Sequence, residues 1–166
     1  MSLTNNFLAL VGALAAMTAP EAEFPSTALL SIGFVEVRLN DLRDTETYAK
    51  RRAQPHGYLK ISADLNGDGS LDEVRVLQNV EGDVAYVAAA IMTPDKLDTY
   101  ILKSVPLSEV PYLAIDVAEA GAGLSKEAKG AGVAIFDLRT GSGEATFFDG
   151  NEFVLTSSVT RQIPPS

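Results

Sequence analysis

The chain lacks cysteine altogether and has a single histidine, His56, among its 166 residues. The absence of cysteine excludes disulfides, thiolate zinc sites and cysteine nucleophiles. One histidine leaves little material for a histidine-based triad or zinc site. We therefore interpret His56, which precedes Gly57 at a predicted turn, as a surface residue. A chain of this length buries enough surface to fold without disulfides.

Familiar catalytic motifs are missing as well. The sequence has no Gly-x-Ser-x-Gly nucleophile elbow, phosphate loop or dinucleotide fingerprint, and Gly141-Ser142-Gly143 is better interpreted as a turn than as the site of a catalytic serine. The paired acids of a glycoside hydrolase assemble in space and not in sequence. Asp116, Glu119 and Asp137 therefore stay as candidates, although nothing in the sequence distinguishes them. The sequence leaves enzymatic activity undecided and leans against it.

Positive charge is scarce, because 13 Lys and Arg stand against 22 Asp and Glu, for a net charge of -9. Nucleic acids and anionic membranes need positive fields on their partners. Both are disfavoured here, and cation binding is compatible with the charge. We interpret the basic cluster Lys50-Arg51-Arg52 as a solvated helix end, and a docking patch for an acidic partner is the alternative.

The N-terminal segment has no run long enough to cross a bilayer, which takes about 20 apolar residues. Its uncharged apolar run over 7–16 has the length of a signal-peptide core, and small residues suited to cleavage follow it, although residues 1–6 carry no Lys or Arg. We predict a signal peptide over 1–19 and a linker over 20–30. The protein would then be periplasmic or secreted, with no stable membrane insertion after cleavage. The alternative is a cytoplasmic protein with an N-terminal apolar helix packed on its core.

Most of the remaining sequence has the period of β-strands. Residues 40–53 look helical, with Asn40 or Asp41 as a cap and Pro55 as a stop, whereas 28–39 fits either a helix or a strand. After Gly57, apolar and polar residues alternate. The expected strands span 57–65, 74–77, 84–92, 100–105, 112–117, 133–138, 144–148 and 152–157, and the last two flank a tight Asp149-Gly150 turn.

These segments predict a single α+β domain over 31–161. Its core is a mainly antiparallel β-sheet with one N-terminal helix packed on it. The stretch 121–132 is rich in Gly, Ala and Lys and predicts a mobile surface loop, and 162–166 predicts a disordered tail. We expect Phe147, Phe148 and Phe153 to pack in the sheet and not to form a ligand platform.

The most informative segment alternates oxygen-bearing side chains with glycine between two predicted strands. Calcium takes six to eight oxygen ligands at roughly 2.3–2.6 Å, and a short peptide can supply several by turning tightly around the ion. Gly67 and Gly69 permit the positive φ of such a turn, and we expect Leu71 to point inward and anchor it. The predicted calcium (Ca²⁺) ligands are Asp64, Asn66, Asp68, the backbone carbonyl of Ser70, and Asp72.

This loop departs from the EF-hand pattern. An EF-hand has a bidentate Glu at the twelfth position and helices on both sides, whereas counting from Asp64 the twelfth residue is Arg75 and the flanks alternate like strands. We expect a structural ion with weak affinity, Kd about 10⁻⁴ to 10⁻³ M, as in extracellular modules. Magnesium fits less well because it keeps more of its water.

The segment resembles the Asp-x-Asn-Gly-Asp-Gly-x-x-Asp calcium loops of FG-GAP and VCBS-type repeats. Those loops also lie between strands, in exported and surface proteins. The resemblance covers 57–92, and one copy does not imply a propeller. The whole chain is similar to small bacterial exported proteins with one such loop and a late aromatic hairpin, here residues 147–153.

These observations favour a small exported calcium-binding protein that acts as a non-enzymatic binding or interaction module. Its partner would be another protein or a component of the cell envelope. One alternative is a calcium-stabilised hydrolase acting on the envelope, which would need a concave pocket with two converging acids. Another is a periplasmic inhibitor or immunity protein that acts through the 121–132 loop.

Overall fold

The computed structural model describes residues 33–79, 81–118 and 128–163. The predicted signal peptide and linker, Glu119, most of the 121–132 loop and residues 164–166 lie outside the described residues. Within these ranges, no helix is long and apolar enough to cross a membrane.

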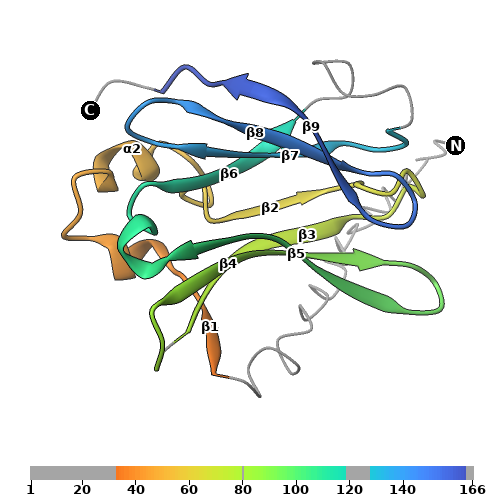
Figure 1. Cartoon of the computed structure of the whole chain (residues 1–166), viewed down its shortest axis with the longest axis horizontal. Coiled ribbons are helices and arrows are strands. Elements are labelled where there is room, and N and C mark those ends of the chain that lie inside the picture. The colour runs from red at the N-terminus through yellow and green to blue at the C-terminus, as the bar shows by residue number, and fades with distance from the viewer. Residues whose placement is uncertain (1–32, 80, 119–127, 164–166) are drawn as a thin grey trace, which may run out of the picture.

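The described chain forms two antiparallel sheets (Figure 1). The first, sheet A, contains β1 (Phe34–Glu36), β2 (Lys60–Ala63), β3 (Asp72–Asn79), β4 (Val84–Met92) and β5 (Leu97–Pro106). Its order is β1-β3-β4-β5, and β2 also pairs with β3. The second, sheet B, has the order β6 (Leu113–Ala118), β7 (Gly132–Asp137), β8 (Ser142–Phe148) and β9 (Phe153–Thr160). The predicted mainly antiparallel β fold is confirmed, as two sheets instead of one.

The main hydrophobic core draws side chains from both sheets. Val74 and Val87 of sheet A and Ile115 and Val133 of sheet B belong to one cluster, and each is completely buried. In β3 the apolar residues alternate with polar ones, whereas β4 is buried along almost its whole length. The nearly continuous apolar run of 84–92 is the composition that a strand covered on both faces requires.

The two sheets also meet along their edges. Strand β2 lies beside β6 in the centre of Figure 1, and the Ile115 amide donates to the Tyr58 carbonyl at 2.9 Å just before β2 begins. At the other edge, the Tyr100 ring of β5 lies 5.4 Å from the Phe148 ring and 5.6 Å from the Phe153 ring. The predicted packing role of the late phenylalanines is confirmed, since Phe147 and Phe148 are buried and Phe153 contacts the core.

The last strand of each sheet order, β5 in sheet A and β9 in sheet B, carries a β-bulge. In β5 the register with β4 passes from Lys103 to Ile101, which leaves Leu102 as an extra residue. In β9 the register with β8 passes from Ser157 to Leu155, which leaves Thr156 as an extra residue. An extra residue bends its strand and increases the local twist.

The single helix predicted over 40–53 is present only in part. The structure has a 3-10 helix, η1 (Leu39–Leu42), and a five-residue α-helix, α2 (Tyr48–Arg52). Thr45 lies between them and donates from its hydroxyl to the Leu42 carbonyl at 2.7 Å. Short polar side chains compete in this way with the helical pattern, which accounts for the interruption. A second 3-10 helix, η2 (Leu107–Glu109), leads into β6.

The interpretation of Lys50-Arg51-Arg52 as a solvated helix end is wrong for its central residue. Arg52 is exposed, but Arg51 is completely buried. Its guanidinium donates to the backbone carbonyls of Gly57, Val110, Pro111 and Leu113 at 2.7–3.1 Å. Burial lowers the pKa of Arg51 to about 10. Arg51 therefore connects α2 to the start of sheet B through these hydrogen bonds.

Candidate metal-binding loop

The candidate calcium loop, residues 64–72, connects β2 to β3. These strands pair antiparallel, and the pair Ala63–Asp72 closes the base of the loop. Gly67 and Gly69 have φ of +76° and +87°, the left-handed conformation that glycine adopts without a steric penalty. The loop is thus a tight turn held between two strands.

Asp64 organises the turn through its carboxylate. Its Oδ1 accepts hydrogen bonds from the amides of Gly67 (2.6 Å) and Asp68 (3.1 Å), and its Oδ2 accepts one from Gly69 (2.9 Å). Three backbone donors therefore converge on one side chain. Each carboxylate oxygen has two lone-pair directions, so these bonds leave capacity for a further electropositive ligand.

Asn66 and Asp68 contact each other at the exposed side of the loop. Asn66 Oδ1 accepts from the Asp68 amide at 2.9 Å, and its Nδ2 donates to Asp68 Oδ2 at 3.0 Å and to the Met92 carbonyl at 3.3 Å. Asp68 Oδ1 accepts from the Ser70 amide at 2.7 Å. Hydrogen bonds from Ser70 and Asn66 lower the pKa of Asp68, so this carboxylate is ionised at neutral pH.

Asp72 differs from the other predicted ligands because it is completely buried. Its Oδ2 accepts from the Leu65 amide at 2.9 Å, and its Oδ1 accepts from the Met92 amide at 2.8 Å. Burial raises the pKa of Asp72, and the negative charge of Asp68 raises it further. Asp72 therefore ties the base of the loop to the end of β4 with a carboxylate that is costly to ionise.

The loop also packs closely on the segment that leads into β7. The Ala131 amide donates to the Asp64 carbonyl at 2.8 Å. A Cβ on Gly67 would lie 2.6 Å from the Lys129 carbonyl oxygen, and a Cβ on Gly130 would collide with backbone atoms of Asp64 and Leu65. Sequence reasoning missed this role of Gly130, because nothing local in the sequence indicates which backbone it approaches.

The expectation that Leu71 anchors the loop is wrong. Leu71 is 64% exposed, whereas Leu65 is 1% exposed and belongs to the main core. Leu65 lies directly after Asp64, and the turn that follows it reverses the direction of the chain. Side-chain alternation from β2 therefore does not continue through the loop to Leu71.

The chemistry of the donors suits a hard cation, since the five predicted ligands offer only oxygen atoms. Their present arrangement is closed by internal hydrogen bonds. Within residues 33–79, 81–118 and 128–163, no group of three or more His, Cys, Asp or Glu side chains is already placed to hold a metal ion. Asp68 is exposed and Asn66 is partly exposed. Either side chain would have to exchange hydrogen bonds within the loop for contact with an ion.

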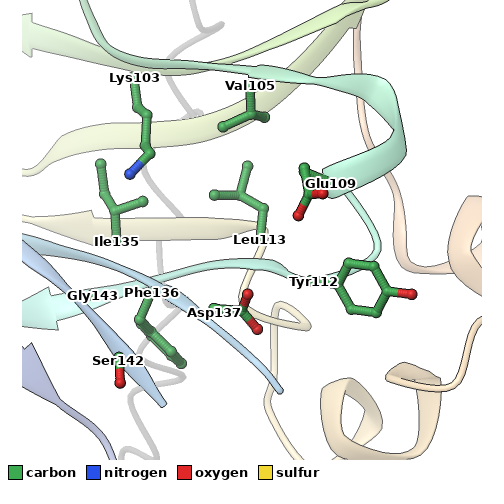
Figure 2. A pocket seen from close by; sticks show the side chains of 10 residues that line it. All are labelled: Lys103, Val105, Glu109, Tyr112, Leu113, Ile135, Phe136, Asp137, Ser142 and Gly143. Atoms are coloured by element: carbon green, nitrogen blue, oxygen red, sulfur yellow. The ribbon is translucent and has the colours of Figure 1, made fainter. Parts of the chain in front are cut away.

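A second group of acids converges on a cavity between the sheets (Figure 2). Arg139 Nη2 contacts Glu109 at 3.0 Å and Asp137 at 2.5 Å, and its guanidinium lies 3.9 Å from the centre of the Tyr112 ring. Arg139 lowers the pKa of Asp137. A hydrolytic acid pair needs one carboxyl with a raised pKa, and Asp137, with its lowered pKa, does not meet that requirement.

The other sequence candidates lie apart from the loop. Asp116 is paired with Arg161 at 3.1 Å, and His56 is exposed as expected. Gly141 has φ of +73° and forms the predicted turn, while Ser142 and Gly143 begin β8. Arg75, at the twelfth position counted from Asp64, pairs with Glu36 and Glu73 on the surface of sheet A.

Comparison with known proteins adds no assignment: no family model, no curated protein and no solved structure matches this chain.

Proposed function

We propose that the protein is a small exported calcium-binding protein that serves as a non-enzymatic binding or interaction module. Loop 64–72 would hold one structural calcium ion between β2 and β3. The ligands would be the side-chain oxygens of Asp64, Asn66, Asp68 and Asp72 together with the Ser70 carbonyl. When bound, calcium supplies a double positive charge at the point where these carboxylates meet.

Asp72 carries this proposal. Its carboxylate is completely buried, and the charged side chain that acts on its pKa is Asp68, another acid. A buried carboxylate is costly unless it is paired. Hydrogen bonds from the backbone of Met92, Leu65 and Asn66 offset part of that cost. A cation beside the loop would offset the rest together with the repulsion from Asp68.

A bound ion would stabilise more than the turn itself. The loop contacts the end of β4 through Met92 and the approach to β7 through Ala131. It therefore contacts sheet A and the residue that immediately precedes β7 of sheet B. Because an ion that binds only the folded state shifts the folding equilibrium, about 1 mM calcium with a Kd near 0.1 mM would add about 1.4 kcal/mol to the free energy of unfolding.

The weak affinity expected for calcium and the expected export from the cytoplasm are consistent with each other. A loop without the bidentate Glu binds calcium usefully only where the ion is abundant, as outside the cytoplasm. The apolar run over 7–16 independently favours export. The partner would be another protein or an envelope component.

Thermal unfolding with calcium and with EDTA tests the site. We expect about 1 mM calcium to raise the Tm of the wild-type protein by about 5 °C relative to EDTA, and equimolar magnesium to raise it less. Asp68→Ala removes an exposed ligand and should abolish the response. Asp95→Ala, an exposed acid in the β4–β5 turn, is the matched control and should retain it.

The pH dependence gives a second readout. The raised pKa of Asp72 means that the folded protein binds this proton more tightly than the unfolded chain does, so without calcium this group's contribution to stability falls as pH rises through that pKa. Calcium needs the ionised form, so its stabilising effect should weaken as pH falls through the same range. If the wild-type protein at neutral pH has the same Tm with calcium as with EDTA, as Asp68→Ala should, the site is ruled out.

A further inference from the structure

A cavity of about 280 Å³ opens between β5 of sheet A and β6 to β8 of sheet B (Figure 2). Its apolar lining consists of Val105, Leu113, Ile135 and Phe136, each less than 10% exposed. Ligand sites in proteins have volumes on the order of 300–1,000 Å³ and mostly apolar walls with a few polar groups. The cavity lies just below that range and therefore suits a ligand smaller than a typical drug molecule.

One end of the cavity is already closed by charges of the chain. Arg139 Nε donates to Asp137 Oδ1 at 3.0 Å and to its Oδ2 at 2.9 Å, and Arg139 also holds Glu109 and covers the Tyr112 ring. A guanidinium that contacts both oxygens of a carboxylate has a defined orientation as well as a stronger interaction. An external cation would have to displace the Arg139 guanidinium, which stays close to Asp137 because the two residues are only two positions apart in the chain.

The other end offers a cation that is held more loosely. Lys103 points toward Ile135 at the cavity (Figure 2), and its Nζ pairs with Glu144 Oε1 at 2.7 Å. Both side chains of this pair are more than one-third exposed, at 37% and 35%. Ion pairs with this exposure contribute little to stability. A carboxylate that enters the cavity can therefore take the place of Glu144 on Lys103 at small cost.

We propose that this cavity binds a small apolar monocarboxylate, such as a medium-chain fatty acid. The hydrocarbon chain would cover Val105, Leu113 and Ile135, and the carboxylate would contact the Lys103 ammonium. The net charge of -9 opposes an anion at long range, but salt screens exposed charges beyond about 8 Å at physiological ionic strength. The short-range contact with Lys103 therefore determines which head group binds.

Calorimetric titration with three eight-carbon probes tests the chemistry of the ligand. With EDTA present, so that calcium takes no part, we expect octanoate to bind with a Kd on the order of 1 mM or lower. Octanol, which lacks the charge, should bind about tenfold more weakly, and octylamine more weakly still. Tightest binding of octylamine would assign the cavity to cations and overturn the proposal, as would no binding of octanoate.

Three variants locate the site. Lys103→Gln should weaken octanoate to the level of octanol and leave octanol unchanged. Lys96→Gln removes a lysine that is 66% exposed beside β5 and pairs with Asp98, and it should change neither affinity. Ser142→Phe at the exposed rim of the cavity should weaken both probes by obstruction. Circular dichroism checks that each variant is folded, and unchanged octanoate binding by folded Lys103→Gln would refute the contact.

Discussion

At the scale of single residues, two buried charges of opposite sign fix the positions of separate segments. Asp72 accepts backbone amides from Leu65 and Met92, and Arg51 donates to four backbone carbonyls. Both side chains hydrogen-bond to backbone groups, and leaving such a group buried without a partner costs about 1–3 kcal/mol. The Pro111 carbonyl alone among the four also accepts from the Thr47 hydroxyl. Neither role is local in sequence, since Arg51 reaches carbonyls about 60 residues away.

Replacing Arg51 with methionine should therefore be severe. Arg51→Met keeps the apolar stem but leaves the carbonyls of Gly57, Val110 and Leu113 without their donor. We expect the free energy of unfolding to fall by about 3 kcal/mol, measured by urea denaturation. Arg52→Met, one position along and exposed, should change it by no more than about 0.5 kcal/mol. Equal effects of the two substitutions would contradict the assigned role of Arg51.

At the scale of elements, the strands follow from local pattern and the exceptions follow from contacts that are distant in sequence. The alternation after Gly57 and the apolar run over 84–92 predicted β2 to β4, because side chains of a strand alternate between two faces whatever their partners are. The helix predicted over 40–53 is only partly present, since the Thr45 hydroxyl donates to the Leu42 carbonyl between the two helical pieces. The exposure of Leu71 and the burial of Arg51 depend on neighbours that a local pattern does not contain.

In the candidate loop, too, some features are visible in the sequence and others depend on contacts distant in sequence. Its residue types and glycine spacing are visible in the sequence, and the structure places the loop between β2 and β3 as expected. The close packing of Gly130 on the Asp64 backbone is not visible, because Asp64 follows β2 and Gly130 precedes β7, and the two residues meet only in the folded chain.

A pair of glycine substitutions separates this packing from turn conformation. Gly130→Ala places a Cβ against the Asp64 and Leu65 backbone, and we expect a loss of about 2–3 kcal/mol in the free energy of unfolding. Gly69→Ala meets no neighbouring atom within 4 Å but keeps a φ of +87°, and should cost about 1–2 kcal/mol. A milder effect at Gly130 than at Gly69 in urea denaturation would show that the contact is easily relieved.

At the scale of the whole molecule, the two sheets enclose the main hydrophobic core between them and contact each other at two places along their edges. The edge formed by β5 and the β8–β9 hairpin depends on aromatic packing, because Tyr100 contacts both Phe148 and Phe153. The edge formed by β2 and β6 contains the hydrogen bond from Ile115 to Tyr58. Docking of the sheets therefore depends on side chains far apart in the sequence.

Removing the Tyr100 ring tests that docking. We expect Tyr100→Ala to lower the free energy of unfolding by about 3 kcal/mol, since the ring loses both its buried area and two aromatic contacts. Ile101→Ala, its neighbour on β5 with 48% exposure, should cost about 0.5 kcal/mol or less. Chemical denaturation of both variants measures the difference, and a Tyr100→Ala protein as stable as Ile101→Ala would show that the aromatic contacts do not hold the sheets together.

The bulges at Leu102 and Thr156 bear on how the molecule behaves in a crowded solution. Strands β5 and β9 end the two sheet orders, and a straight strand in such a position is a template on which other chains add and grow into fibrils. An extra residue breaks the regular spacing of backbone donors and acceptors and twists the strand away from an incoming one. The two bulges therefore make the last strand of each sheet order a poorer template for an incoming chain. In β9 this backbone irregularity lies in a strand whose side chains carry no charge.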